Sequence, residues 1–139
     1  MHASKPHDLL ALAREAARHS YSVYSHFPVG AVLECADGTR VTGTNVENRS
    51  FGLTNCAERS ALFAAVSMGK REFRALAVVC PEAAAPVAPC GACRQALSEF
   101  CPPDMPVYFT GRDGTVVVAT TMGELLPKDS LHGLKDGQR

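Results

Sequence analysis

The chain has 139 residues, 46% of them apolar and 20% charged, and its 14 Lys and Arg are balanced by 14 Asp and Glu. This size and composition are typical of one globular domain with a substantial core, so we expect a single domain over residues 1–139. Zero net charge without a basic run disfavours binding of a polymeric nucleic acid, which requires Lys and Arg to neutralise phosphates. The N-terminal MHASKPHD lacks the apolar core of a signal peptide, and no apolar run is long enough to cross a membrane. We therefore expect a cytoplasmic protein.

The N-terminal third of the chain predicts a helix followed by a β-hairpin. Residues 8–21 repeat apolar side chains at helical spacing, which favours an amphipathic helix. Residues 28–47 then contain two Val-rich apolar runs joined by Asp37-Gly38. This dipeptide between two apolar runs favours a tight turn, so two antiparallel strands are expected here.

The middle of the chain predicts a second helix and a central strand. Thr54 and Asn55 are residue types that cap helix N-termini, and a Gly such as Gly69 often follows a helix end. A helix is therefore expected between these positions. The run FRALAVVC at 73–80 is short and almost continuously apolar, which is typical of a strand covered on both faces.

The last third of the chain alternates again between helix and strand. Helical spacing recurs within residues 89–100, and residues 105–111 and 115–120 read as two further strands. Thr121 and Glu124 form a capping box that predicts a short final helix.

Helices interleaved with five strands predict an α/β fold with helices on both faces of the sheet. We expect a three-layer α-β-α sandwich around a mixed five-stranded sheet. The polar tail, residues 130–139, is expected to be partly flexible.

The six cysteines divide into two groups. Three disulfides are one possibility, but metal binding or catalysis is more usual in a chain that is not secreted. Three cysteines that lie within or beside apolar runs are interpreted as small core residues: Cys35, Cys80 and Cys101. Three others lie in polar motifs flanked by Gly or Pro: Cys56, Cys90 and Cys93.

Cys90-Gly-Ala-Cys93 is a C-x-x-C motif, which occurs both in zinc sites and in redox dithiols. A redox dithiol has no use for a third thiol, whereas Cys56 lies at the predicted start of another helix. A structural zinc site normally has four protein ligands, and neither a second C-x-x-C nor a nearby His accompanies these motifs. Three cysteine ligands leave one coordination position open, and a catalytic zinc keeps such a position for water or substrate.

Two charged residues follow Cys56. The free N–H groups and dipole of each helix start would offset part of the negative charge of three thiolates on Zn²⁺, and Arg59 is expected to donate to thiolate sulfur. The alternative is that Arg59 is an ordinary solvent-exposed residue of the helix. Glu58 is poorly placed as a fourth ligand, because residues two apart do not share a helix face, but it could reach the open position and carry protons. The alternative is a capping box with Asn55, which leaves the cysteines unexplained.

The blocks around these residues resemble the signature of an enzyme family. NVEN at 45–48, CAERSA at 56–61 and PCGACRQ at 89–95 are similar to blocks of the small homotetrameric cytidine deaminases. FPVGA at 27–31 and ELLP at 124–127 extend the resemblance over nearly the whole chain. A C-x-E followed by P-C-x-x-C is also the general pattern of zinc deaminases. The resemblance implies a cytidine deaminase-like fold and a Zn²⁺ cofactor. It further implies hydrolytic deamination of cytidine and 2′-deoxycytidine to uridine and 2′-deoxyuridine, with release of ammonia, in pyrimidine salvage.

The resemblance also implies a role for each matched residue. It makes Glu58 the proton shuttle, which takes a proton from water and delivers protons to ring nitrogen N3 and the leaving amine. It implies three zinc ligands: Cys56, Cys90 and Cys93. It implies four substrate contacts: Phe27 against the pyrimidine, Asn45 and Glu47 with the ribose 3′-hydroxyl, and the Ala57 backbone amide with the base. It finally implies a homotetramer in which neighbouring subunits help to complete each site.

Two positions depart from the family pattern. Phe51 stands where many members have Tyr, and Ser130 stands where the family usually places a Phe that enters a neighbour's pocket. Another side chain then covers the base, or affinity is reduced, or the preferred substrate is a modified cytidine.

Three rival functions remain at this point. A deaminase of an antibiotic nucleoside of the blasticidin kind is disfavoured by Asn45 and Glu47, which indicate a ribose-bearing substrate. A polynucleotide-editing deaminase is disfavoured by the neutral charge. A non-catalytic zinc module would have no use for Glu58.

Overall fold

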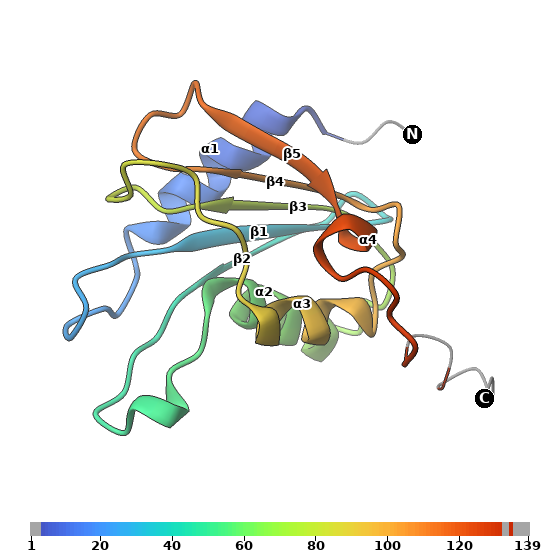
Figure 1. The fold of residues 1–139 in the computed structure, drawn as a ribbon, viewed down its shortest axis with the longest axis horizontal. Helices are drawn as coiled ribbons and strands as arrows, with labels where there is room; N and C mark the ends of the chain where they lie inside the picture. Colours follow the sequence, from blue (N-terminus) through green and yellow to red (C-terminus); the bar gives the residue numbers. More distant parts are fainter. Residues whose placement is uncertain (1–3, 132–133, 135–139) are drawn as a thin grey trace.

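The computed structural model describes residues 4–131 and residue 134. Its elements, in chain order, are α1 (Pro6–Ala17), β1 (Gly30–Cys35), β2 (Arg40–Thr44), the 3-10 helix η1 (Phe51–Leu53), α2 (Ala57–Ser67), β3 (Phe73–Val79), α3 (Gly91–Ser98), β4 (Pro106–Thr110), β5 (Val117–Thr121) and α4 (Met122–Leu125). The strands form one sheet, with α1 on one side and α2 and α3 on the other (Figure 1).

The sheet is mixed, and its strand order is β2-β1-β3-β4-β5. β1 runs antiparallel to both β2 and β3, β4 and β5 are antiparallel, and β3 and β4 form the parallel pair. A parallel pair needs a crossover connection, and α3 provides it here (Figure 1). The predicted α/β fold with a mixed five-stranded sheet is confirmed.

The central strands are buried on both faces, as predicted for 73–80. In β1, Leu33 packs into the core under α2 and α3, whereas its neighbour Val32 packs against α1. In β3, Leu76 likewise packs into the core under α2 and α3, and Ala77 packs into the core under α1. The alternation follows from the twofold period of side chains along a strand. The three cysteines assigned to the core from sequence are all buried: Cys35, Cys80 and Cys101.

Two predicted boundaries differ from the structure. The first helix was expected over 8–21 but ends at Ala17, because the chain then turns and Tyr21 pairs with Val46 beside β2. The second helix was expected to be capped by Thr54 or Asn55, but Cys56 is its N-cap. Asn55 instead exchanges backbone hydrogen bonds with Val46. Tertiary pairing determines both boundaries.

Close packing of α2 against β2 fixes the position of the helix start. Gly43 lies under α2, and a Cβ built on it would be 2.4 Å from the Ala61 nitrogen and 2.6 Å from the Ala57 oxygen. Both atoms belong to the α2 backbone and cannot move aside without the helix. A glycine at this point therefore lets α2, and the residues at its start, approach the sheet.

Gly43→Ala is expected to lower the free energy of unfolding by on the order of 1–3 kcal/mol, because it overpacks a tight contact. Gly52→Ala is a matched control, since a Cβ there would meet nothing within 4 Å. Thermal unfolding followed by circular dichroism measures both. Equal melting temperatures for the two variants would show that the contact is looser than the structure indicates.

The C-terminal tail is described only in part. Ser130 is exposed in a turn after α4, whereas residues 132–133 and 135–139 lie outside the described residues. The predicted flexibility of 130–139 therefore stays a prediction. Within the described part of the chain, the helices are all too short or too polar to cross a membrane.

Candidate active site

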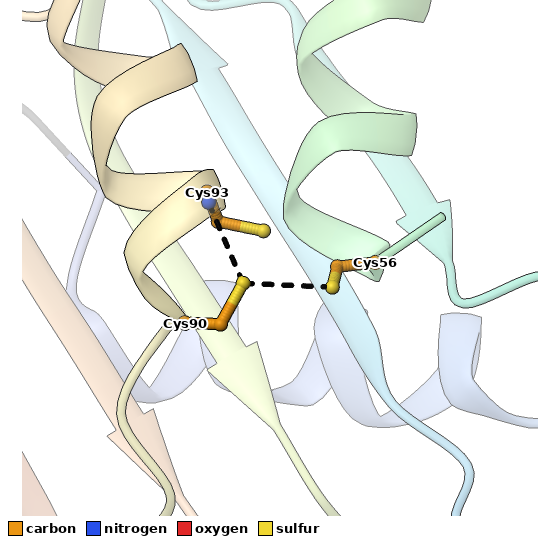
Figure 2. Close-up of side chains that lie close together, drawn as sticks. All are labelled: Cys56, Cys90 and Cys93. Atoms are coloured by element: carbon orange, nitrogen blue, oxygen red, sulfur yellow. Dashed lines mark hydrogen bonds between the residues drawn. The ribbon is translucent and has the colours of Figure 1, made fainter. Parts of the chain in front are cut away.

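Three thiols meet where two helices begin. Cys56 is the N-cap of α2, Cys90 is the N-cap of α3, and Cys93 lies in the first turn of α3. Figure 2 shows the three side chains pointing toward one another. Their sulfurs all lie within 4.8 Å of one another, and those of Cys56 and Cys90 are 3.8 Å apart. Tetrahedral zinc with Zn–S bonds of about 2.3 Å holds its sulfurs roughly 3.8 Å apart, so the cluster fits a zinc ion.

The surroundings of the cluster favour thiolates. The Cys93 backbone N–H donates to the Cys90 sulfur at 3.5 Å (Figure 2), and Arg59 Nη2 donates to the Cys56 sulfur at 3.4 Å. Hydrogen bonds from Cys93, Arg59 and Cys90 lower the pKa of the Cys56 thiol to about 5, although burial opposes this shift. The same hydrogen bond and burial raise the pKa of the Cys93 thiol. Metal binding would displace its proton, because thiolates are the ligands that metals bind.

Arg59 lies at the cluster rather than in solvent. Its Nη2 contacts Cys56, while its Nε is buried and has no hydrogen-bond partner among the described residues. The pKa of the guanidinium is raised by hydrogen bonds to Cys56 and Cys93, so it stays charged. A fixed positive charge here offsets the negative charge of bound thiolates.

Glu58 is a buried carboxyl beside the thiols. It is the second residue of α2, and only 4% of it is exposed. Burial raises its pKa to about 7, and the neighbouring Cys56 charge adds to this effect. A carboxyl with such a pKa can both accept and release a proton near neutral pH. A capping box between Asn55 and Glu58 would require Glu58 at the third helical position and a side-chain hydrogen bond at the N-cap. The structure contradicts this alternative, because Glu58 is the second residue of α2 and the N-cap makes no such bond.

Glu58 and two of the thiols, those of Cys56 and Cys90, line a cavity of about 420 Å³, a size suited to a small molecule. Of the site residues expected from sequence, seven line this cavity: Phe27, Asn45, Glu47, Cys56, Ala57, Glu58 and Cys90. Cys93 is fully buried behind its wall. The structure thus brings together residues from four separate sequence blocks.

Other wall residues were missed from sequence. They are mostly apolar or small: Ser25, Val29, Thr54, Asn55, Val78, Cys80, Val87 and Ala88. Val78 and Cys80 lie at the carboxyl end of β3, and open α/β sheets bind ligands at the carboxyl ends of strands. The strand was predicted as a central one, but the order and direction of its neighbours in the sheet were not, so this signal could not be used.

Asn45 and Glu47 also line the cavity. The Asn45 side chain is buried; its Nδ2 donates to the Phe27 carbonyl at 2.9 Å, and its Oδ1 accepts from the Val29 N–H at 2.8 Å. Glu47 accepts hydrogen bonds from Tyr24 and Ser25. The Ser25 hydroxyl is the largest cause of the lowered pKa of Glu47, which keeps the carboxylate ionised.

The two positions that depart from the family pattern lie outside this cavity. Phe51 is 74% exposed and packs edge-on against the Tyr24 ring, with centroids 5.8 Å apart. Ser130 is exposed and does not line the cavity.

Several known proteins are similar to this chain. A cytidine deaminase of Sporosarcina psychrophila is 51% identical over 119 residues, which cover 86% of each chain. A cytidine deaminase of Halalkalibacterium halodurans is 49% identical, with 86% of this chain and 89% of the relative covered. The crystal structure of a cytidine deaminase from Burkholderia pseudomallei matches with a TM-score of 0.86 and 47% identity, covering 90% of this chain and 98% of that one. A blasticidin-S deaminase of Bacillus cereus is more distant, at 28% identity over 86% of this chain.

The family model agrees with these relatives. Residues 3–109 match the model of the cytidine and deoxycytidylate deaminase zinc-binding region. The matched segment contains all three clustered cysteines and Glu58. The chain therefore belongs to the cytidine and deoxycytidylate deaminase family, whose zinc-binding region it carries.

Proposed function

We propose that this protein is a zinc-dependent cytidine deaminase. It hydrolyses cytidine and 2′-deoxycytidine to uridine and 2′-deoxyuridine and releases ammonia, in pyrimidine salvage. The observation that carries the proposal is the buried Glu58 carboxyl beside three converging thiols, inside a cavity large enough for a nucleoside. The similarity to two cytidine deaminases at about half identity supports the substrate.

The thiolates of Cys56, Cys90 and Cys93 hold the zinc. Bound there, zinc supplies the Lewis acidity that makes water a nucleophile near neutral pH. Glu58 accepts a proton from the water that attacks C4 of the pyrimidine. It delivers that proton to N3, which loses its double bond to C4. It then takes the proton of the new C4 hydroxyl and delivers it to the exocyclic nitrogen, so that the C4 carbonyl forms as ammonia leaves. One carboxyl can serve every transfer because it is buried beside the thiols, where burial raises its pKa towards neutrality.

The other walls of the cavity orient the nucleoside. Phe27 packs against the pyrimidine, and the Ala57 backbone N–H donates to the base. Asn45 and Glu47 bind the ribose 3′-hydroxyl. Both are held in place by hydrogen bonds to the 24–29 segment, so the sugar subsite is preorganised.

The protein acts as a homotetramer in the cytoplasm. Large apolar side chains exposed on η1, on α2 and at the C-cap of α2 support association: Phe51, Leu53, Phe63 and Met68. Light scattering after size-exclusion chromatography measures the oligomeric state. The cytoplasm suits a site that needs three reduced thiols.

A deaminase of a modified cytosine nucleoside is the second candidate. It is favoured by Ser130, which stands where the family usually places the Phe that enters a neighbour's pocket. The distant blasticidin-S deaminase shows that relatives with this function exist.

A substrate panel tests the proposed function. The purified, zinc-loaded protein is expected to convert cytidine and 2′-deoxycytidine, followed by the change in ultraviolet absorbance, and to leave cytosine and adenosine unchanged. Free cytosine lacks the ribose that Glu47 binds, which explains its exclusion. Faster conversion of 5-substituted cytidines or blasticidin than of cytidine would favour the second candidate, and no conversion of any cytosine nucleoside would refute both.

A further inference from the structure

The segment 20–29 contributes Ser25, Phe27 and Val29 to the cavity wall, and hydrogen bonds to Asn45 and Glu47 hold it there. His26 has a positive φ of 56°, which is uncommon for a residue other than Gly, and its N–H donates to the Ser22 carbonyl at 2.9 Å. This strained turn places Phe27 at the cavity. A strained backbone persists only where surrounding contacts determine it, so the hydrogen bonds of this segment decide where Phe27 lies.

Ser25 links Phe27 to Glu47, and both of these residues line the cavity. Its hydroxyl donates to Glu47 Oε2, and its oxygen accepts from the Phe27 N–H at 3.1 Å. Its backbone N–H donates to Glu47 Oε1 at 3.1 Å, beside the Tyr24 N–H at 2.9 Å. Oε1 thus receives two backbone donors, while the orientation of Oε2 depends on the Ser25 hydroxyl. The same hydroxyl therefore contacts both the carboxylate assigned to the sugar and the backbone of the residue assigned to the base.

We propose that Ser25 is a positioning residue that couples the sugar subsite to the base subsite through its hydrogen bonds to Glu47 and Phe27. The proposal rests on the proposed function, in which those two residues contact the nucleoside. Ser25 orients one carboxylate oxygen toward the 3′-hydroxyl and holds the Phe27 backbone at the same time. A nucleoside that engages Glu47 thereby meets a base subsite that is already set.

This role predicts a specific pattern of kinetic loss. Ser25→Ala removes the donor to Glu47 Oε2 and the acceptor for the Phe27 N–H, so ground-state binding weakens while the proton transfers of Glu58 are unaffected. The KM for 2′-deoxycytidine is expected to rise about tenfold, with kcat changed less than about threefold. The KM for 2′,3′-dideoxycytidine, which lacks only the 3′-hydroxyl, should rise about threefold or less. Ser25→Thr keeps the hydroxyl and should restore the parent KM.

Ser22→Ala provides the matched control, because Ser22 lies in the same turn and its side chain has no hydrogen-bond partner among the described residues. It should leave both KM values unchanged. The proposal would be overturned if Ser25→Ala raised the KM equally for the two nucleosides, or raised neither. Turnover of cytidine by the parent protein would still uphold the proposed function in that case.

A second measurement needs no turnover. In a ¹³C NMR titration of the Glu carboxyls, Ser25→Ala should raise the pKa of Glu47 toward its ordinary value, and Ser22→Ala should not. An unchanged Glu47 titration in Ser25→Ala would refute the link even if the protein converted no nucleoside at all.

Discussion

Glu58→Gln is expected to keep the fold and the zinc and to lose deamination by a factor of at least about 10²–10⁴, the usual contribution of a positioned acid–base group. Gln has nearly the shape of the buried Glu side chain, so the start of α2 should be undisturbed. Its amide cannot take a proton from water and pass it to N3. Zinc content, circular dichroism and the ultraviolet assay with cytidine measure the three properties separately.

Glu15→Gln is the control for this variant. It makes the same chemical change at an exposed position of α1, on the opposite side of the sheet from α2 and α3 (Figure 1). Full activity is expected, because among the described residues its ion pair is with Arg18, at the surface. Cytidine turnover by Glu58→Gln at the parent rate would remove Glu58 from the chemistry.

Cys93→Ala is expected to lose both the zinc and the activity. The parent should hold one zinc per chain, since the described residues contain one cluster of three metal-binding side chains. Removal of a fully buried ligand leaves two thiols, too few to hold the ion at the open geometry of a catalytic site. Elemental analysis of the purified proteins gives the zinc content, and thermal unfolding shows how much stability the ion supplies.

Cys35→Ala separates ligand loss from the loss of a buried thiol. Cys35 is as buried as Cys93 but lies at the end of β1 among core residues. It should lose some stability and keep its zinc. The metal assignment would be refuted if the parent protein contained no zinc, or if Cys93→Ala still contained one zinc per chain.

Much of the fold could be predicted from sequence because its signals are local. The Asp37-Gly38 turn and the apolar run at 73–80 each indicate an element by the residues within it. The capping of α2 was predicted wrongly at Thr54 or Asn55, since the backbone of Asn55 is engaged by Val46. Pairing with a residue distant from the helix start leaves no trace in the local pattern.

The site was predicted as far as its chemistry depends on residue type. Thiols, a carboxyl and a guanidinium at two helix starts indicated a metal site, and the structure brings Cys56, Cys90 and Cys93 within 4.8 Å of one another. The walls could not be predicted in the same way. Ser25 and Cys80 are ordinary residue types, and only the folded arrangement places them at the cavity.

The cavity is built from two kinds of parts, and this has a consequence for engineering. The reacting end comes from the starts of α2 and α3, and α2 is held close to the sheet by contacts such as that of Gly43. The remaining walls come largely from connecting segments, including Ser25 before β1 and Val87 and Ala88 before α3. Variant libraries confined to those segments can search for enzymes that convert cytosine prodrugs while the proton chemistry stays constant.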